Sequence, residues 1–101
     1  MAEDVFSALA NPTRRALLGL LLERPRPVRE LAGHFDMRRP SVSEHIKVLR
    51  DAGLVQVRVD GNQRLYRVDA DRLAEVRHQL EGFWGERLGR LASGIAGEAE
   101  R

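Results

Sequence analysis

Residues 28–53 read VRELAGHFDMRRPSVSEHIKVLRDAG. Apolar side chains recur there at helical spacing in two sets, which predicts two consecutive helices: Val28, Leu31, Ala32 and Phe35, and then Val42, Ile46 and Leu49. Asp36-Met37 is the expected connection, the second helix is expected from about Arg39 to Ala52, and Gly53 ends it. Two helices joined by so short a turn must cross steeply, so the segment is predicted to be a helix-turn-helix.

The residues after Gly53 change from helical spacing to alternation of apolar and polar side chains. Leu54–Val59 and Gln63–Val68 both read as strands, with Asp60-Gly61-Asn62 between them. An Asp-Gly pair between two alternating segments is a strong signal for a hairpin. Residues 54–68 are therefore predicted to form a two-stranded wing beside the helix-turn-helix.

Helices are predicted on both sides of this unit. A short one covers about residues 3–10. Asn11-Pro12 then combines a preferred N-cap with the residue best suited to the first helical position, and Pro25-Arg26-Pro27 stops the helix that follows. A long closing helix covers about residues 71–93. The expected architecture is mainly α with a small β-hairpin, in the order α-α-α-α-β-β-α, as one winged helix-turn-helix domain over residues 1–101.

The composition is that of one globular domain. A chain of 101 residues with 43% hydrophobic and 32% charged residues has room for a single core. No apolar run approaches the roughly 20 residues that cross a bilayer, and the acidic start Met-Ala-Glu-Asp does not resemble a signal peptide. The absence of cysteine excludes disulfides, thiol catalysis and thiolate metal sites. We therefore expect a cytoplasmic protein with no membrane partner.

Positive charge is concentrated in one third of the chain. The formal net charge is only +2, although the isoelectric point is near 9.9. Residues 37–68 carry seven Lys and Arg residues against three acidic ones, so this segment has a net charge of +4 and the remainder −2. The third of the chain that contains most of the motif is thus the third suited to a polyanion such as DNA.

Several separated motifs resemble one family. They are FSALANPTRR at 6–15, VRELA at 28–32, PSVSEHIKVLRDAGLV at 40–55 and RLY at 64–66. In this order, and over nearly the whole chain, they resemble the ArsR/SmtB family of bacterial winged-helix repressors. The resemblance implies a homodimer on the nucleoid of a bacterial cytoplasm, a recognition helix in the major groove of double-stranded DNA, and repression relieved by a signal. Repression, as opposed to activation, is implied by the resemblance alone.

The second helix of the motif is expected to read DNA. Apolar residues occupy its inward positions, and the outward side chains at the amino-terminal end of a recognition helix are those usually aimed at base edges. Arg39 suits guanine and Glu44 suits cytosine, while on the wing Arg64 suits the adjacent minor groove or backbone. The alternative for both elements is an ordinary solvated surface. The candidate DNA-binding residues are Arg38, Arg39, Ser41, Ser43, Glu44, Lys47, Arg58 and Arg64.

Two positions depart from the pattern of the family. Arg38 stands where the family usually has a small hydroxyl residue that caps the recognition helix. Because arginine cannot cap in this way, the sequence does not fix the first residue of that helix. Asp36 stands where the turn commonly takes glycine, and aspartate tolerates a left-handed conformation.

The first and last helices carry more apolar surface than a small domain can bury within itself. We expect them to form the dimer interface, with aromatic anchors of the kind common in interfaces. The alternative is that the aromatic residues of the closing helix cover the chain's own core. Glycines at 82, 85 and 89 fit either a close helix approach or plain surface positions. The expected interface residues are Val5, Phe6, Leu9, Leu80, Phe83, Trp84, Leu88 and Leu91.

No residue pattern identifies the signal that would release such a repressor from DNA. Many members of the family bind metals through cysteines in the helix that holds Leu31–Phe35, and this chain has no cysteine there. Its three histidines, His34, His45 and His78, lie on different predicted elements and do not form a cluster in the sequence. No metal and no cofactor are expected, and an unknown small-molecule or protein effector is left open. The sequence contains no phosphate-binding loop, nucleophile elbow or acid–base pair, so no motif in it indicates an enzyme. The competing function is a winged-helix module that binds a protein or senses a small molecule.

Overall fold

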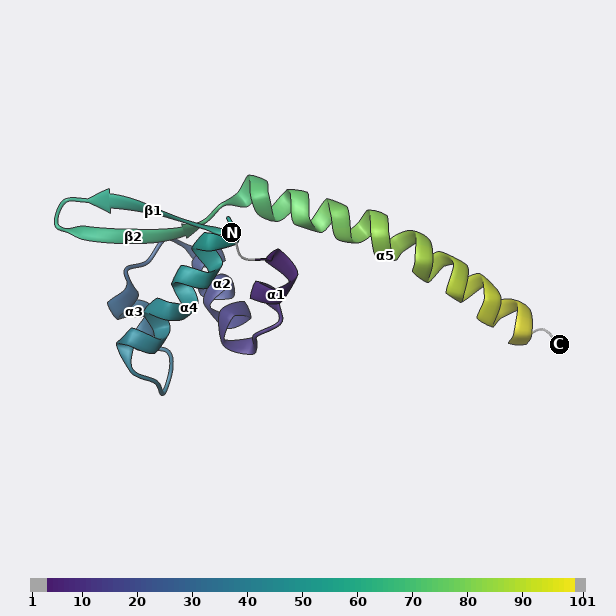
Figure 1. Cartoon of the computed structure of the whole chain (residues 1–101), viewed down its shortest axis with the longest axis horizontal. Helices are drawn as coiled ribbons and strands as arrows, with labels where there is room; N and C mark the ends of the chain where they lie inside the picture. The colour runs from purple at the N-terminus through teal and green to yellow at the C-terminus, as the bar shows by residue number, and fades with distance from the viewer. Residues whose placement is uncertain (1–3, 100–101) are drawn as a thin grey trace.

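Seven elements follow one another in the predicted order. The computed structural model describes the backbone of residues 4–99 and the side chains of residues 4–85, 87, 89 and 90. The helices α1 to α4 form a body, the β1–β2 hairpin lies along it, and α5 runs away from it (Figure 1). This is the winged helix-turn-helix predicted from the sequence. The elements are α1 (Val5–Leu9), α2 (Pro12–Glu23), α3 (Val28–Ala32), α4 (Arg39–Asp51), β1 (Val55–Asp60), β2 (Gln63–Val68) and α5 (Ala70–Ala99).

The core lies where α2, α3 and α4 meet. Its largest fully buried side chains come from these helices and from the residue before the hairpin, and each contributes roughly 1.5–3 kcal/mol of hydrophobic stabilisation: Leu17, Leu31, Val42, Ile46, Leu49 and Leu54. The three α4 residues predicted to point inward are all among them. Because α4 packs one face on this core, its opposite face is left to solvent.

The Asn-Pro-Thr-Arg-Arg motif joins α1 to α2. Asn11 is the predicted N-cap of α2, since its Oδ1 accepts a hydrogen bond from the backbone N–H of Arg14 at 3.1 Å. The side chain of Arg14 turns back to α1, where its Nε donates to the carbonyl of Ala8 at 2.7 Å. Arg15 does the same, with Nη1 donating to the carbonyl of Leu9 at 2.8 Å. These bonds satisfy carbonyls at the end of α1 that have no partner within the helix.

The apolar side chains of α1 lie in two environments. Val5 is buried in the chain's own core and Leu9 is half-buried against it, whereas Phe6 is 50% exposed. Successive residues of a helix point about 100° apart, so a short helix packs only one of its faces on the core. Of the three α1 residues expected at a dimer interface, Phe6 is therefore the one that this chain leaves uncovered.

The turn between α3 and α4 is longer than predicted. α3 ends at Ala32, and residues 33–38 connect it to α4, so Phe35 belongs to the connection. The three amides after Ala32 each bond to the carbonyl three residues earlier, which tightens the chain into successive turns. The left-handed conformation considered for Asp36 is wrong, because within the described chain positive φ angles occur only at glycine.

The loop of the hairpin is shorter than the sequence indicates. Asp60 pairs with Gln63, so only Gly61-Asn62 lies between the strands, and β1 runs one residue later than predicted. Gly61 has a φ of 63°, and Asn62 has a negative φ. A positive φ at the first loop residue alone indicates a type II′ turn, which favours glycine there and matches the twist of the flanking strands.

Arg26 makes a contact that the sequence did not predict. Its N–H donates to the carbonyl of Tyr66 at 3.0 Å, and its carbonyl accepts from the N–H of Tyr66 at 2.9 Å, so this residue pairs with β2. Its side chain is only 7% exposed. The guanidinium donates to the carbonyl of Leu20 at 3.0 Å and to the carboxylate of Glu23 at 2.9 Å. The segment predicted to stop a helix also anchors the wing.

α5 leaves the body after about two turns. Asp69 caps it, since its Oδ1 accepts from the N–H of Arg72 at 3.1 Å, and Leu73 and Val76 pack on the core. The helix then continues to Ala99, past its predicted end near residue 93, and the molecule measures 65 Å by 28 Å by 28 Å (Figure 1). Neither α5 nor another helix in the described part of the chain is both long and apolar enough to cross a bilayer.

The substitution Arg26→Ala is expected to lower the free energy of unfolding by about 1–3 kcal/mol, because it leaves a carbonyl of α2 without its donor. The measurement is the midpoint of urea unfolding. The control is Arg77→Ala, whose side chain is 80% exposed and pairs with Glu81, and whose loss should cost less than about 0.5 kcal/mol. Equal midpoints for the two variants would contradict the anchoring role of Arg26.

Candidate nucleic-acid interface

The eight side chains predicted to contact DNA are all exposed. Within the described residues, none of them forms a side-chain hydrogen bond or an ion pair with the rest of the chain. Other arginines do: Arg14, Arg26 and Arg72 bind carbonyls or carboxylates of their own chain. The polar groups of these eight side chains are therefore left for a partner outside the described residues.

α4 and the wing border a common groove of about 430 Å³. Arg39 and Ser43, one helical turn apart on α4, line it together with Asn62 and Arg64 near the hairpin tip. Tyr66, which is buried, also lines it. The structure thus brings Arg39, chosen from the helix, and Arg64, chosen from the wing, to one concave surface.

Arg58 lies on the other face of the wing from Arg64. In an antiparallel pair, directly opposed residues share a face, and Arg64 is opposed by Val59. Successive residues of a strand point to opposite faces, so Arg58 points away from the face that carries Val59 and Arg64. Of the two wing arginines named from the sequence, only Arg64 lines the groove between α4 and the wing.

The α4 candidates occupy two flanks of the helix. Arg39, Ser43 and Lys47 are spaced by four residues and follow one another along one flank. Ser41 is rotated by about 200° from Ser43 and lies on the other flank. Glu44 falls between the flanks, opposite the buried face. Only the Arg39 flank faces the wing.

The amino-terminal end of α4 has no side-chain cap. Arg38 precedes the helix without a capping bond, and Pro40 is its second residue. Proline has no N–H, so this end has one fewer donor that needs a partner. The remaining donors and the helix dipole give the end a partial positive charge, to which Arg38 and Arg39 add two full charges. An end of this kind is suited to an anion such as phosphate.

The groove also has polar lining residues that were not among the candidates from the sequence, including Arg29, Asn62 and Gln63. Arg29, on α3, donates from Nη2 to Gln63 Oε1 at 3.1 Å and so ties α3 to the wing. The only signal for Arg29 was its place in the VRELA motif. The contact joins residues 34 positions apart, and spacing along the chain does not reveal it.

The histidines do not assemble into a metal site in the described residues, where no group of three or more His, Asp or Glu side chains is arranged to hold an ion. On α4, His45 Nδ1 lies 3.3 Å from Arg14 Nη1. Because the guanidinium of Arg14 is always charged, it disfavours the binding of a metal ion at Nδ1 of His45.

Residues 11–57 match the family described as bacterial regulatory protein, arsR family. The HTH-type transcriptional regulator Rv2034 of Mycobacterium tuberculosis is 41% identical over 98 residues, which cover 97% of this chain and 92% of the relative. The chain belongs to the arsR family of bacterial regulatory proteins. It is accordingly a DNA-binding transcriptional regulator, as its motifs predicted.

Two solved structures share the fold of this arsR-family chain. One, described as a possible transcriptional regulator for arsenical resistance, has a TM-score of 0.74 and 42% identity, and the match covers 86% of this chain and 91% of that one. The other is a fragment of Mb0332 from Mycobacterium bovis, described as a homodimeric winged helix-turn-helix DNA-binding domain. It has a TM-score of 0.66 and 30% identity, over 83% of this chain and 78% of that one.

Arg39→Ala is expected to weaken binding to a selected operator by about 1–3 kcal/mol, roughly 5-fold to 150-fold, and to affect random DNA much less. The reason is that a bidentate contact to guanine discriminates between bases. Fluorescence anisotropy at one fixed salt concentration measures both affinities. Arg77→Ala, on α5, serves as the control and should bind both DNAs like the unsubstituted chain. Equal losses on both DNAs would rule out base reading by Arg39.

Proposed function

We propose that this arsR-family chain is a homodimeric repressor that binds a palindromic operator through α4 and the wing. The observation that carries the proposal is the groove between these elements, which Arg39 and Arg64 line without partners in the described chain. A two-fold dimer presents two copies of α4 to successive major grooves, about 34 Å apart. The exposed cations of α4 and the wing supply the charge that binding to phosphates requires. This function places the protein on the nucleoid, in the cytoplasm.

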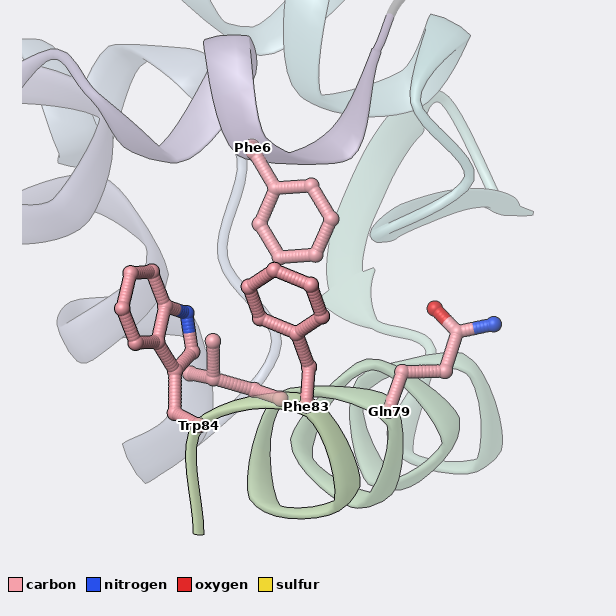
Figure 2. A pocket seen from close by; sticks show the side chains of 5 residues that line it. Phe6, Gln79, Phe83 and Trp84 are labelled. Carbon is pink, nitrogen blue, oxygen red and sulfur yellow. The ribbon is translucent and has the colours of Figure 1, made fainter. Parts of the chain in front are cut away.

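The proposed dimer interface is built on α1 and α5. Four apolar side chains where α1 passes α5 are 40–50% exposed: Phe6, Leu80, Phe83 and Trp84. Together with Gln79 they line an open cavity of about 530 Å³. The ring of Phe6 points from α1 toward that of Phe83 on α5, with Trp84 beside it (Figure 2). The rings of Phe83 and Trp84 meet edge to face, with centroids 5.1 Å apart. Aromatic clusters of this kind anchor interfaces.

The length of α5 favours a second copy of the chain as the occupant of this surface. The radius of gyration is 17.7 Å, whereas a compact domain of about 100 residues has about 13 Å. A Cβ added at Gly82, Gly85 or Gly89 would meet nothing within 4 Å in the described chain. Leu88 and Leu91, also expected at the interface, have side chains outside the described residues. An antiparallel or crossing α5 from a partner would cover this exposed length.

Repression is the direction of regulation that the resemblance to the ArsR/SmtB family implies. The family is one of regulators, and no catalytic activity is proposed. Neither a metal nor a cofactor enters the proposal, and the effector, a small molecule or a protein, is not assigned.

Phe83→Glu is expected to convert the dimer to a monomer, because it places a charge in the apolar surface between α1 and α5. Sedimentation velocity at micromolar concentration measures the change. Ala74→Glu is the matched control, since the same charge then enters the same helix about two and a half turns before Phe83, on the opposite and exposed face. An unchanged sedimentation coefficient for Phe83→Glu would exclude this interface.

Selection of bound sequences from random DNA, followed by footprinting, tests the whole proposal. The expected operator has two symmetric half-sites about one helical turn apart. Its affinity should fall steeply as salt rises, because each phosphate contact contributes about −0.9 to the slope of log affinity against log salt. Transcription from a promoter that overlaps the operator should fall when the protein is added. A flat salt dependence, as for a module that binds protein, would contradict the proposal.

A further inference from the structure

Arg29 lines the groove between α4 and the wing but has no role in the proposed contacts to bases. Arg29 is exposed on α3, and its bond to Gln63 at 3.1 Å leaves most of its five N–H donors free. With Arg39 and Arg64 it brings three guanidinium-bearing residues to a groove of about 430 Å³. This is more positive charge than a base edge requires.

No acidic residue is among the described residues that line this groove. Glu30, next to Arg29 in sequence, is held elsewhere: Arg24 is hydrogen-bonded to its carboxylate, and Arg26 Nη1 lies 3.8 Å from its Oε2. The hydrogen bond from Arg24 lowers the pKa of Glu30, so the carboxylate stays ionised within that pair. None of the described residues that line the groove therefore neutralises its positive charge.

The place of the groove in the fold indicates what occupies it. In the proposed complex α4 enters a major groove of DNA and the wing reaches the adjacent minor groove. Adjacent grooves of the double helix are separated by a sugar-phosphate backbone. The space between α4 and the wing must therefore accommodate a backbone strand, and most contacts of proteins with that strand are made to phosphate oxygens.

We propose that this groove is a phosphodiester subsite, in which one backbone phosphate of the operator is bound by Arg29 and Arg64. Ser43 and Asn62, which line the same groove, supply a hydroxyl and an amide as neutral donors. The inference rests on the proposed function and extends it, since Arg29 both holds the wing through Gln63 and neutralises a phosphate. Arg39 keeps the base contact proposed above.

Free inorganic phosphate carries the same chemistry as the phosphodiester. The open groove favours the DNA backbone, because an extended strand continues past both ends of the subsite and also meets the cations of α4. Addition of inorganic phosphate to the protein–DNA complex distinguishes free phosphate from the DNA backbone as the ligand.

The test uses the 101-residue chain and operator DNA in which one phosphate at a time is replaced by a neutral methylphosphonate. At one position in each half-site the unsubstituted protein should lose about ten-fold in affinity, as expected for the loss of a charge-assisted hydrogen bond. Arg29→Ala should lose less than the unsubstituted protein at that same position, because only the contact from Arg64 to that phosphate is left to lose. All other positions should affect the two proteins equally.

Salt dependence gives a second readout that a purely structural role would not change. Arg29→Ala should reduce the slope of log affinity against log salt by about 1 for each protomer bound, on operator and random DNA alike. Between 50 and 200 mM salt this is about a three-fold to four-fold smaller loss of affinity per protomer. Arg29→Lys keeps the charge and should keep the slope. Gln63→Ala removes only the bond to the wing and should also keep the slope.

The failures of the two proposals are distinguishable. If the unsubstituted protein shows no salt-dependent binding to DNA, the proposed function fails. If it binds DNA but Arg29→Ala retains the full slope and the full sensitivity to every methylphosphonate, the subsite is disproved and the function stands. If inorganic phosphate at constant ionic strength dissociates the complex of the unsubstituted protein but not that of Arg29→Ala, the groove is a site for free phosphate and the assignment to DNA is wrong.

Discussion

The buried guanidinium of Arg26 connects the parts of this molecule that must keep a fixed arrangement. Its side chain donates to the carbonyl of Leu20 at the end of α2, its backbone pairs with Tyr66 of β2, and Glu30 of α3 lies 3.8 Å away. A buried charge is tolerated only when it is paired and hydrogen-bonded. Arg26 meets that condition only while α2, α3 and the wing stay together. The position of the wing relative to α4, and with it the groove, depends on this residue.

Arginine serves two purposes in this chain, and the structure separates them. Arg14, Arg15 and Arg26 bind backbone carbonyls at the ends of helices, where the chain has acceptors without donors. Arg39 and Arg64 have no partner in the described residues and border the groove. A guanidinium cannot be neutralised by losing its proton near pH 7, so an unpaired one on the surface remains available to an external anion.

Contacts in the described chain link the proposed dimer surface to the recognition helix. Arg14 binds the carbonyls of Ser7 and Ala8 in α1 and lies 3.3 Å from His45 in α4. Phe6, which is exposed toward α5, belongs to the same short helix. In the proposed dimer the distance between the two α4 helices is set through α1 and α5, and half-site spacing on DNA follows from that distance.

The sequence alone determined the order and type of the elements, the cap of α2 at Asn11, the inward face of α4 and the glycine-dependent hairpin. Each of these depends on residues within about one or two turns of one another, where periodicity and capping act. The tertiary structure decided the length of the turn before α4, the pairing of Arg26 with Tyr66 and the bond between Arg29 and Gln63. It also decided that Val5 packs inward while Phe6 stays exposed. These features join residues that are distant in sequence or compete for one core, and only the packed chain specifies which of them come within contact distance.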